Sequence, residues 1–207
     1  MSPSDRLLGL IIACCLIFVG YQIYFFPQRV RARRYYSLLI DLDQRIRFEP
    51  VWVWVYTVAY YPFILSLVFL VSSWHEYTYV ASSFFFMLAI QATIALIFPV
   101  RTPFEWREYH LGTISRRLLS TVQRIDRGGN CFPSMHVSVA VLSAMHIQII
   151  CDPEIILSAV IWLFPILVSL STVYTKQHFV LDVPAGVLHA VVCIAAFDYI
   201  SQKVSLS

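Results

Sequence analysis

Charged residues are scarce in this chain. Only 13% of its 207 residues are charged, whereas about a quarter are charged in an average soluble protein. Hydrophobic residues make up 59% of the sequence, which leaves little chain for a soluble domain. The composition therefore excludes an ordinary soluble domain and indicates a membrane protein.

Metal-ligand spacings, an even set of cysteines and internal repeats are also missing. The five cysteines are an odd number, and Cys14, Cys15 and Cys193 lie inside apolar runs. Cys131 and Cys151 bracket one apolar run, and a helix of that length would hold them roughly 30 Å apart, too far for a disulfide. We therefore expect no disulfide framework, no metal site and no cofactor.

Long apolar runs dominate the sequence instead. Windows of about 20 apolar residues, enough for a helix to cross roughly 30 Å of hydrocarbon, lie at about 7–26, 51–71, 79–99, 134–150, 155–174 and 180–200. They lack the alternating polar residues of barrel strands, so the expected fold is an all-α polytopic bundle of six transmembrane helices. We expect one transmembrane domain over residues 1–207, with surface loops at 27–50 and 100–133. The first run is longer than a signal-peptide core, so we expect it to be retained as a span.

Positive charge gathers at one end of the predicted bundle. Of the 15 lysines and arginines, 13 fall at this end: Arg29, Arg31, Arg33, Arg34, Arg45, Arg47, Arg101, Arg107, Arg116, Arg117, Arg124, Arg127 and Lys176. The positive-inside rule predicts that this end faces the cytoplasm, and we expect a multi-pass protein of the cell membrane. The loop at 27–50 fits either a segment lying on the membrane surface or a solvated connector. The long loop at 100–133 ends in the turn Gly128-Gly129-Asn130, and we expect it to be functional.

Two polar motifs stand at this same end. Cys131-Phe132-Pro133-Ser134-Met135-His136 opens the fourth apolar run, and Tyr174 to Asp182 leads into the sixth. His178 and Asp182 are four residues apart, so on a helix the carboxylate can hold the Nδ1-H of His178 and leave Nε2 free as a nucleophile. Attack on phosphorus would form a phosphohistidine, and His136 would then act as the acid for the departing alkoxide and the base for water.

A transferred phosphoryl group needs positive charge and oriented donors around its oxygens. The start of the fourth run offers backbone N–H groups and the Ser134 hydroxyl, which together form an anion site. Arg101 and Lys176 lie at span ends on the same side, and arginine can bind phosphate with two parallel hydrogen bonds. We therefore predict Arg101, Ser134 and Lys176 as phosphate-binding residues. Because this site is arginine-rich and lies at the membrane interface, we expect a lipid phosphate as substrate, membrane lipids around it, and no nucleic-acid partner.

The two motifs resemble the second and third signatures of the type-2 phosphatidic acid phosphatase superfamily. The resemblance rests on Pro133-Ser134-Met135-His136 and on His178-Phe179-Val180-Leu181-Asp182, and it covers roughly residues 40 to 200. Met135 and the flanking residues are similar to the branch that includes inositol phosphorylceramide synthase. The resemblance implies six membrane helices, His178 as nucleophile, Asp182 as its orienting acid, His136 as acid, and catalysis without a metal. Bacterial members commonly face outward, which opposes the orientation that the charges predict.

The sequence departs from the family pattern in two places. Ile94 stands where the first signature has a lysine, and Ser171-Thr172 stands where the third signature has Ser-Arg. Lys176 is a candidate replacement for that arginine.

Three further polar residues lie inside apolar runs. We interpret Gln91 as a hydrogen-bonding contact between helices. We interpret His146 and His189 as bundle residues, with a supporting role beside the site as the alternative for His189.

Three classes of function remain compatible with the sequence. The first is a phosphatase that hydrolyses a lipid phosphomonoester through a phosphohistidine. The second is a lipid phosphotransferase that moves a phosphoryl headgroup to an alcohol, which the short loops disfavour. The third is a non-enzymatic transporter or scaffold, which would leave the grouped His136, His178 and Asp182 unexplained.

Overall fold

The computed structural model describes residues 1–30 and 34–205. All regular elements of that part are helical: α1 (Pro3–Arg29), α2 (Asp41–Arg45), η1 (Pro50–Trp52), η2 (Trp54–Ala59), α3 (Tyr60–Leu70), α4 (Trp74–Ile97), η3 (Phe104–Arg107), α5 (Ile114–Ile125), α6 (Met135–Cys151), α7 (Ile155–Tyr174) and α8 (Asp182–Ser205). The predicted all-α fold class is thus confirmed. Arg31 and Arg33, which were counted among the gathered charges, lie outside the described residues.

Five stretches of the described chain are long and apolar enough to cross a membrane. They are α1, the continuous run Pro50–Leu70, α4, α7 and α8 up to Lys203. The sixth predicted span corresponds to α6, which is also apolar but has only 17 residues. The five spans and α6 follow the predicted windows closely.

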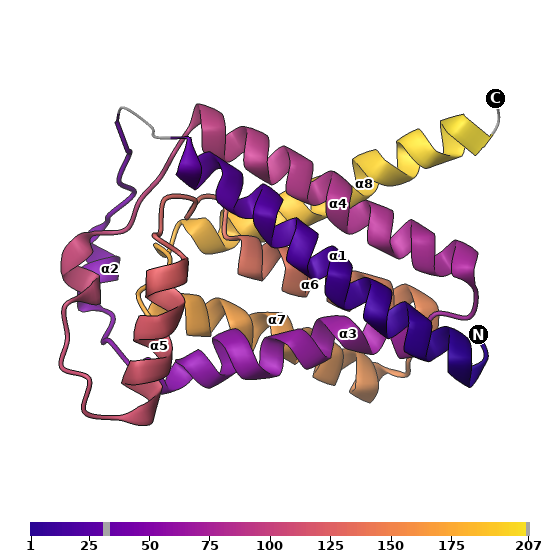
Figure 1. Ribbon diagram of the computed structural model, residues 1–207, viewed down its shortest axis with the longest axis horizontal. Coiled ribbons are helices and arrows are strands. Elements are labelled where there is room, and N and C mark those ends of the chain that lie inside the picture. Colours follow the sequence, from indigo (N-terminus) through magenta and orange to yellow (C-terminus); the bar gives the residue numbers. More distant parts are fainter. Residues whose placement is uncertain (31–33, 206–207) are drawn as a thin grey trace.

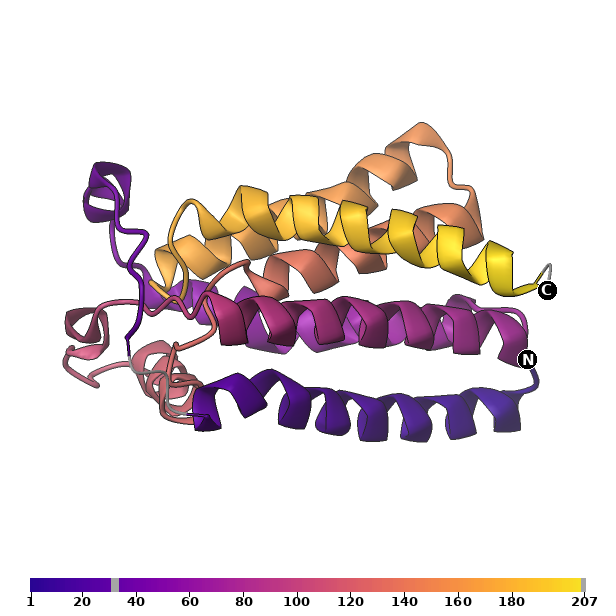
Figure 2. The ribbon, with the colours of Figure 1, turned by 90° about the horizontal axis from the view of Figure 1, so that it is seen from above.

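Helix α6 lies at the centre of the bundle. It packs against α3, α4, α7 and α8, whereas the main helix contacts of α1 are with α3 and α4. Figures 1 and 2 show the long helices running side by side along one axis. Ala140, Ser143 and Ala144 of α6 are completely buried, because small side chains let neighbouring helix backbones approach closely. A face of small side chains thus places α6 close to its neighbours.

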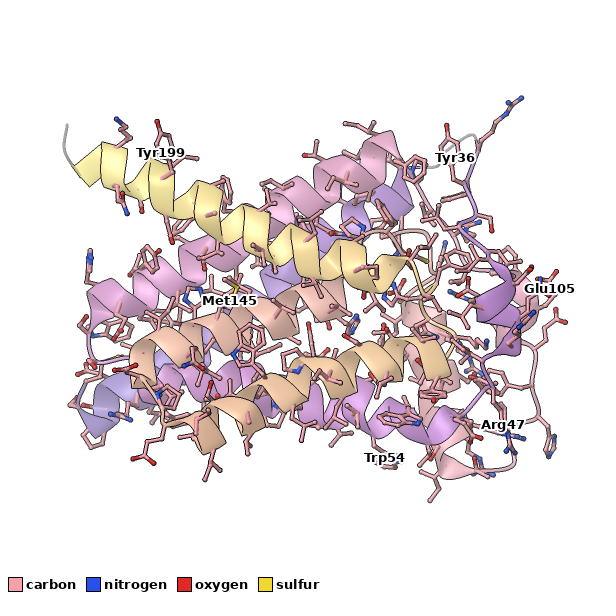
Figure 3. All side chains as sticks on the ribbon, turned by 180° about the vertical axis from the view of Figure 1, so that it is seen from behind. Tyr36, Arg47, Trp54, Glu105, Met145 and Tyr199 are labelled. Carbon is pink, nitrogen blue, oxygen red and sulfur yellow. The ribbon has the colours of Figure 1, made fainter. Side chains whose placement is uncertain are left out.

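The two ends of the bundle differ in character. Both described chain ends lie together at one end, where the helices are joined by short turns (Figure 2). The opposite end carries α2, α5 and the long loops (Figure 1). In Figure 3, Tyr36, Arg47 and Glu105 mark this loop end, and Tyr199 lies far from it. The gathered positive charges therefore share one end with the two motifs.

Helix α4 begins earlier than the sequence indicated. The predicted windows 51–71 and 79–99 leave a connection at 72–78, and this length is wrong. The helix starts at Trp74, so only Ser72 and Ser73 remain in the turn before it. The Ser73 hydroxyl accepts the Glu76 N–H at 3.1 Å, and the Glu76 carboxylate accepts the Ser72 N–H at 2.6 Å. The first bond satisfies a donor that a helix start leaves unpaired, and the second fastens the residue before the cap to the first turn, so the helix begins at Trp74.

The long loops are folded against each other at the charged end. The Tyr36 N–H donates to the Pro99 carbonyl and the Arg101 N–H donates to the Tyr36 carbonyl, which joins the two loops. Helix α5 crosses the end of the bundle (Figure 1), and its Ser115 hydroxyl is 3.0 Å from the Trp54 indole nitrogen. Gly128 has a positive φ of 66°, and a side chain there would overlap the Arg107 guanidinium. Glycine is therefore required at this turn.

Candidate functional site

The loop that carries His178 is held by the end of α7. Lys176 adopts a left-handed conformation with φ 58°, which ends the helix. The N–H groups of Gln177 and His178 then donate to the Thr172 carbonyl at 3.0 and 3.2 Å. Such a left-handed cap satisfies the last carbonyls of a helix and sets the direction of the chain that follows. His178 is thereby buried at the loop end of the bundle, with 2% of its surface exposed.

The His178 ring is oriented by two acceptors. Its Nδ1 lies 2.8 Å from the Cys131 carbonyl oxygen and 3.3 Å from Asp182 Oδ2. A carbonyl oxygen can only accept a hydrogen bond, so Nδ1 carries the hydrogen and Nε2 keeps its lone pair. The geometry leaves Nε2 as the free, nucleophilic nitrogen.

Asp182 links the two motifs. Its Oδ2 accepts the Phe179 N–H at 2.8 Å, and its backbone carbonyl accepts the Ser134 N–H at 3.1 Å. Gly186 lies one turn further along α8, where a Cβ would stand 2.7 Å from the Ser134 carbonyl oxygen. The glycine therefore permits the close approach of α8 to the start of α6.

His136 faces His178 from the first turn of α6. The two ring centroids are 6.2 Å apart, and the His136 ring stacks on Tyr56 at 3.9 Å and lies 4.9 Å from Tyr60. The Nδ1 of His136 is buried without a hydrogen-bond partner among the described residues. The fold thus brings His136 to the same place as His178 and Asp182, which lie more than 40 residues further along the sequence.

Ser134 adds a donor at the same place. It is the residue before α6 and is completely buried, and its hydroxyl has no hydrogen-bond partner within the described part of the chain. The first N–H groups of a helix also lack partners inside the helix and favour an anion. The Ser134 hydroxyl and the start of α6 can together bind phosphate oxygens.

The comparisons with known proteins agree with this arrangement. A family model described as the PAP2 superfamily matches residues 38–196, well over half of the chain. The chain belongs to the PAP2 superfamily. The resemblance to the type-2 phosphatidic acid phosphatases is confirmed, and membership supports a function of the phosphatase or phosphotransferase type. No curated protein and no solved structure shows a significant match.

Lys176 and Arg101, two of the predicted phosphate ligands of this PAP2 protein, contact residues other than His136 and His178. The Lys176 ammonium donates to the Asp43 carbonyl and lies 5.0 Å from the centre of the Trp106 ring. Burial lowers the pKa of Lys176, and the nearby Asp43 opposes that shift. The Arg101 guanidinium lies 3.7 Å above the Tyr35 ring and lines a cavity beside α5. Phosphate binding by these two residues stays a prediction.

The other polar residues inside the bundle have partners in other segments of the chain. Gln91 Nε2 donates to the Pro133 carbonyl at 2.9 Å, so this residue joins α4 to the turn before α6 rather than to another helix. His146 Nε2 lies 2.7 Å from the Ser83 hydroxyl, which agrees with its interpretation as a bundle residue. His189 Nδ1 is 3.2 Å from the Ser138 hydroxyl, and that hydroxyl donates to the Ser134 carbonyl at 2.9 Å. His189 is therefore connected to the start of α6 through the Ser138 hydroxyl.

Sequence reasoning missed Asp43 as a site residue. This aspartate belongs to the segment that was predicted as a surface loop, but the structure places it in α2 with only 1% of its surface exposed. Its carboxylate accepts the Val180 N–H at 2.8 Å and the Ile40 N–H at 2.9 Å. Together with the Lys176 contact, these bonds fasten α2 to the loop between His178 and Asp182. Asp43 thus fixes the position of the loop that carries His178 and Asp182.

Replacing Asp43 by asparagine should lower activity and stability together. An amide can accept one of the two N–H groups, but its NH₂ would face the other, which leaves a buried donor unpaired. That loss costs about 1 to 3 kcal/mol, and we expect kcat to fall by about ten-fold or more because small displacements of catalytic groups are costly. Asp41→Asn is the matched control, because Asp41 is exposed on the same helix. Equal behaviour of the two variants in turnover and thermal unfolding would contradict the role of Asp43.

Proposed function

We propose that this PAP2 protein is an integral-membrane phosphatase that hydrolyses a lipid phosphomonoester through a phosphohistidine and without a metal. The observation that carries the proposal is the orientation of the His178 ring beside His136. Its Nδ1 is held by the Cys131 carbonyl at 2.8 Å and by Asp182 at 3.3 Å, and the centre of its ring lies 6.2 Å from that of the His136 ring. A nucleophile held by an orienting acceptor beside a second acid-base group is the arrangement that covalent catalysis requires.

The proposed reaction has two steps. In the first, His178 Nε2 attacks phosphorus and forms the P–N bond, while the P–O bond to the lipid breaks and protonated His136 gives its proton to the departing alkoxide. In the second, His136 takes a proton from water, the water oxygen attacks phosphorus and the P–N bond breaks. Inorganic phosphate leaves, and His178 and His136 return to their starting states. The Ser134 hydroxyl and the first N–H groups of α6 would stabilise the phosphoryl oxygens.

An apolar cavity beside His136 supports a lipid substrate. It has a volume of about 180 Å³ and lies among α1, α3, α4 and α6. Its lining includes Gly20, Ile64, Phe84, Leu88, Val139 and, at the site itself, His136. Dry apolar cavities of about 150 Å³ bind hydrocarbon as large as benzene. We propose that the cavity receives part of the hydrocarbon chain of the substrate while the phosphate lies between the histidines.

Filling this cavity should change the preference for chain length. In Gly20→Leu, the new side chain would point toward Leu88 across the cavity, since a Cβ at this position lies 3.4 Å from Leu88 Cδ2. We expect kcat/KM for a long-chain lipid phosphate to fall about ten-fold relative to a short-chain one, because the apolar area buried by the tail is lost. Val19→Leu is the control, because it places the same leucine side chain on an exposed face of the same helix. The same ratio of rates in both variants would place the tail elsewhere.

We further propose that α6 is a sixth crossing and that the site faces the cytoplasm at the cell membrane. A 17-residue helix spans about 25 Å, which is within the range of transmembrane helices. The excess of arginine at the loop end supports the orientation through the positive-inside rule.

Labelling of an introduced cysteine tests this topology. An Arg34→Cys variant should stay unlabelled by an impermeant thiol reagent in intact cells and become labelled once the membrane is permeabilised. The wild-type protein is the control for the native cysteines. Labelling of Arg34→Cys in intact cells beyond that of the wild type would contradict the cytoplasmic orientation.

Phosphate release by the purified protein tests the function. In detergent with EDTA present, we expect release from at least one of phosphatidate, phosphatidylglycerophosphate and a polyprenyl phosphate. If no phosphomonoester is hydrolysed but a phosphodiester donor transfers its headgroup to an alcohol, the phosphotransferase alternative replaces the phosphatase. Inactivity in both assays would favour the non-enzymatic alternative.

A further inference from the structure

A second cavity, with a polar lining, lies at the loop end of the bundle. It is enclosed by the chain that follows α4 and by helix α5. Its volume is about 530 Å³. The lining residues are Arg101, Phe104, Arg107, Ser120, Gln123, Arg124 and Arg127. None of the lining residues comes from the two histidine motifs, and Arg101 is the one lining residue that the sequence analysis assigned to the catalytic phosphate.

Four arginines line this cavity, and the lining includes no Asp or Glu from the described part of the chain. Glu105, Glu108 and Asp126 adjoin lining residues in the sequence, but none of the three lines the cavity. Asp126 is directed toward α1, where it binds the Tyr24 hydroxyl at 3.0 Å and the Gln28 amide at 2.8 Å. Within the described residues, Arg47 is the only arginine in an ion pair, and it is not among the four. Four like charges without counter-ions repel each other, so an anion in their midst would be attracted strongly.

Some of the donors around the cavity are fixed and unpaired. Gln123 is 6% exposed, and its Oε1 accepts the Tyr109 hydroxyl at 2.8 Å. That bond orients the amide and leaves its buried Nε2 without a partner among the described residues. The buried Nε of Arg101 is unpaired in the same way. A buried amide donor with no partner is costly unless a ligand satisfies it.

Arg107 is held rigidly at the edge of the cavity. Its Nη1 donates to the carbonyls of Gln123 and Asp126 at 3.2 and 3.1 Å, and its Nη2 lies 3.4 Å from the Thr102 hydroxyl. Arg124 and Arg127 are exposed and free to move toward a ligand. The cavity therefore combines fixed donors on one side with mobile guanidinium groups on the other.

We propose that this arginine cavity binds a phosphate group, separately from the catalytic histidines. Phosphate offers several charged acceptor oxygens, which match paired arginine donors and an amide N–H. Helix α5 crosses the charged end of the bundle, and its Ile114 and Ile125 are 72% and 62% exposed, as expected for a helix at a membrane surface. The phosphate belongs either to the headgroup of a membrane lipid or to a free phosphorylated compound. The proposal does not depend on catalysis.

Native mass spectrometry of the detergent-solubilised protein tests the proposal, because it counts bound molecules without requiring turnover. The full chain carries His178→Ala, so that the probes are not consumed, and the probes are inorganic pyrophosphate and phosphatidylglycerol. The test variant adds Arg124→Gln and Arg127→Gln. The matched control adds Arg116→Gln and Arg117→Gln, which remove the same charge from α5 outside the cavity.

We expect at least one probe to bind about ten-fold more weakly to the Arg124/Arg127 variant than to the control. Pyrophosphate as the affected probe would identify a free phosphate ligand, and phosphatidylglycerol would identify a lipid headgroup. Equal weakening in both double variants would show general attraction to positive charge and overturn the proposal. Failure of both probes to bind would overturn it as well. Binding that remains at the histidines is common to both variants and does not enter the comparison.

Discussion

Replacing His178 by alanine should lower phosphate release by at least about 10⁴-fold, because loss of a nucleophile removes the covalent route altogether. The bundle should remain folded, since the Cys131 N–H still donates to the Val100 carbonyl and the Asp182 carbonyl still accepts the Ser134 N–H. The measurement is kcat with a lipid phosphate in the presence of EDTA, together with the thermal unfolding of both proteins. His75→Ala is the control, because His75 is an exposed histidine at the opposite end of the bundle.

A folded His178→Ala protein that retains more than about one hundredth of the wild-type rate would contradict the nucleophilic role. In that case the two histidines would be positioning groups, and another residue would have to attack phosphorus. A variant that fails to fold is distinguished by its unfolding curve. His178→Asn, which keeps a donor toward the Cys131 carbonyl, then provides the second test.

Replacing His136 by alanine should separate the two chemical steps. A lipid alkoxide is a poor leaving group and needs an acid, so turnover of the lipid phosphate should fall by about 10² to 10⁴-fold. With 4-nitrophenyl phosphate the leaving group needs no acid, and the first step should stay fast. The second step lacks its base, so we expect a burst of nitrophenolate equal to the enzyme concentration followed by slow turnover. Rapid-quench kinetics measure the burst.

Two results would contradict this role of His136. Equal losses with the lipid phosphate and with 4-nitrophenyl phosphate, and no burst, would indicate that His136 acts only in binding. Unchanged turnover of the lipid phosphate would remove it from the reaction. The Tyr56 ring, which stacks on His136 at 3.9 Å, offers a comparison, since Tyr56→Phe keeps the stacking surface without altering the histidine.

The helices were predictable because hydrophobic length is a property of the sequence alone. Each predicted window corresponds to a long apolar run or helix in the structure, and the fold class follows from the same signal. The boundaries depended on local bonds instead. Ser73 and Glu76 extend α4 outward by capping, and a reading of hydrophobicity does not detect a cap made of polar residues.

The pairing of His178 with Asp182 was predictable from their spacing, but the other groups that hold His178 in place were not. His178 and Asp182 share a helix-like spacing, whereas the closest partner of His178 is the backbone carbonyl of Cys131. Every residue has a carbonyl, so no side-chain pattern marks this one. Asp43 escaped notice for a related reason: its partner Val180 is 137 residues away and contributes only an N–H group.

Arg101 and Lys176 show that position along the chain does not reveal what a long side chain contacts. Arg101 and Lys176 were selected because they stand at span ends near the motifs. The fold directs the Lys176 ammonium to the Asp43 carbonyl and places Arg101 in the cavity beside α5. A long side chain can reach in several directions from the same backbone position, so its partners are decided by the tertiary contacts of the loops.

The central claim is that His178 carries the phosphoryl group, and trapping of the intermediate tests it most directly. The protein is mixed with a ³²P-labelled phosphomonoester and EDTA, quenched in alkali within milliseconds, and digested for peptide mapping. We predict an acid-labile, alkali-stable label on the peptide that contains His178, with more label in His136→Ala and none in His178→Asn. Turnover without any labelled protein, or an acid-stable label on another residue, would contradict the account.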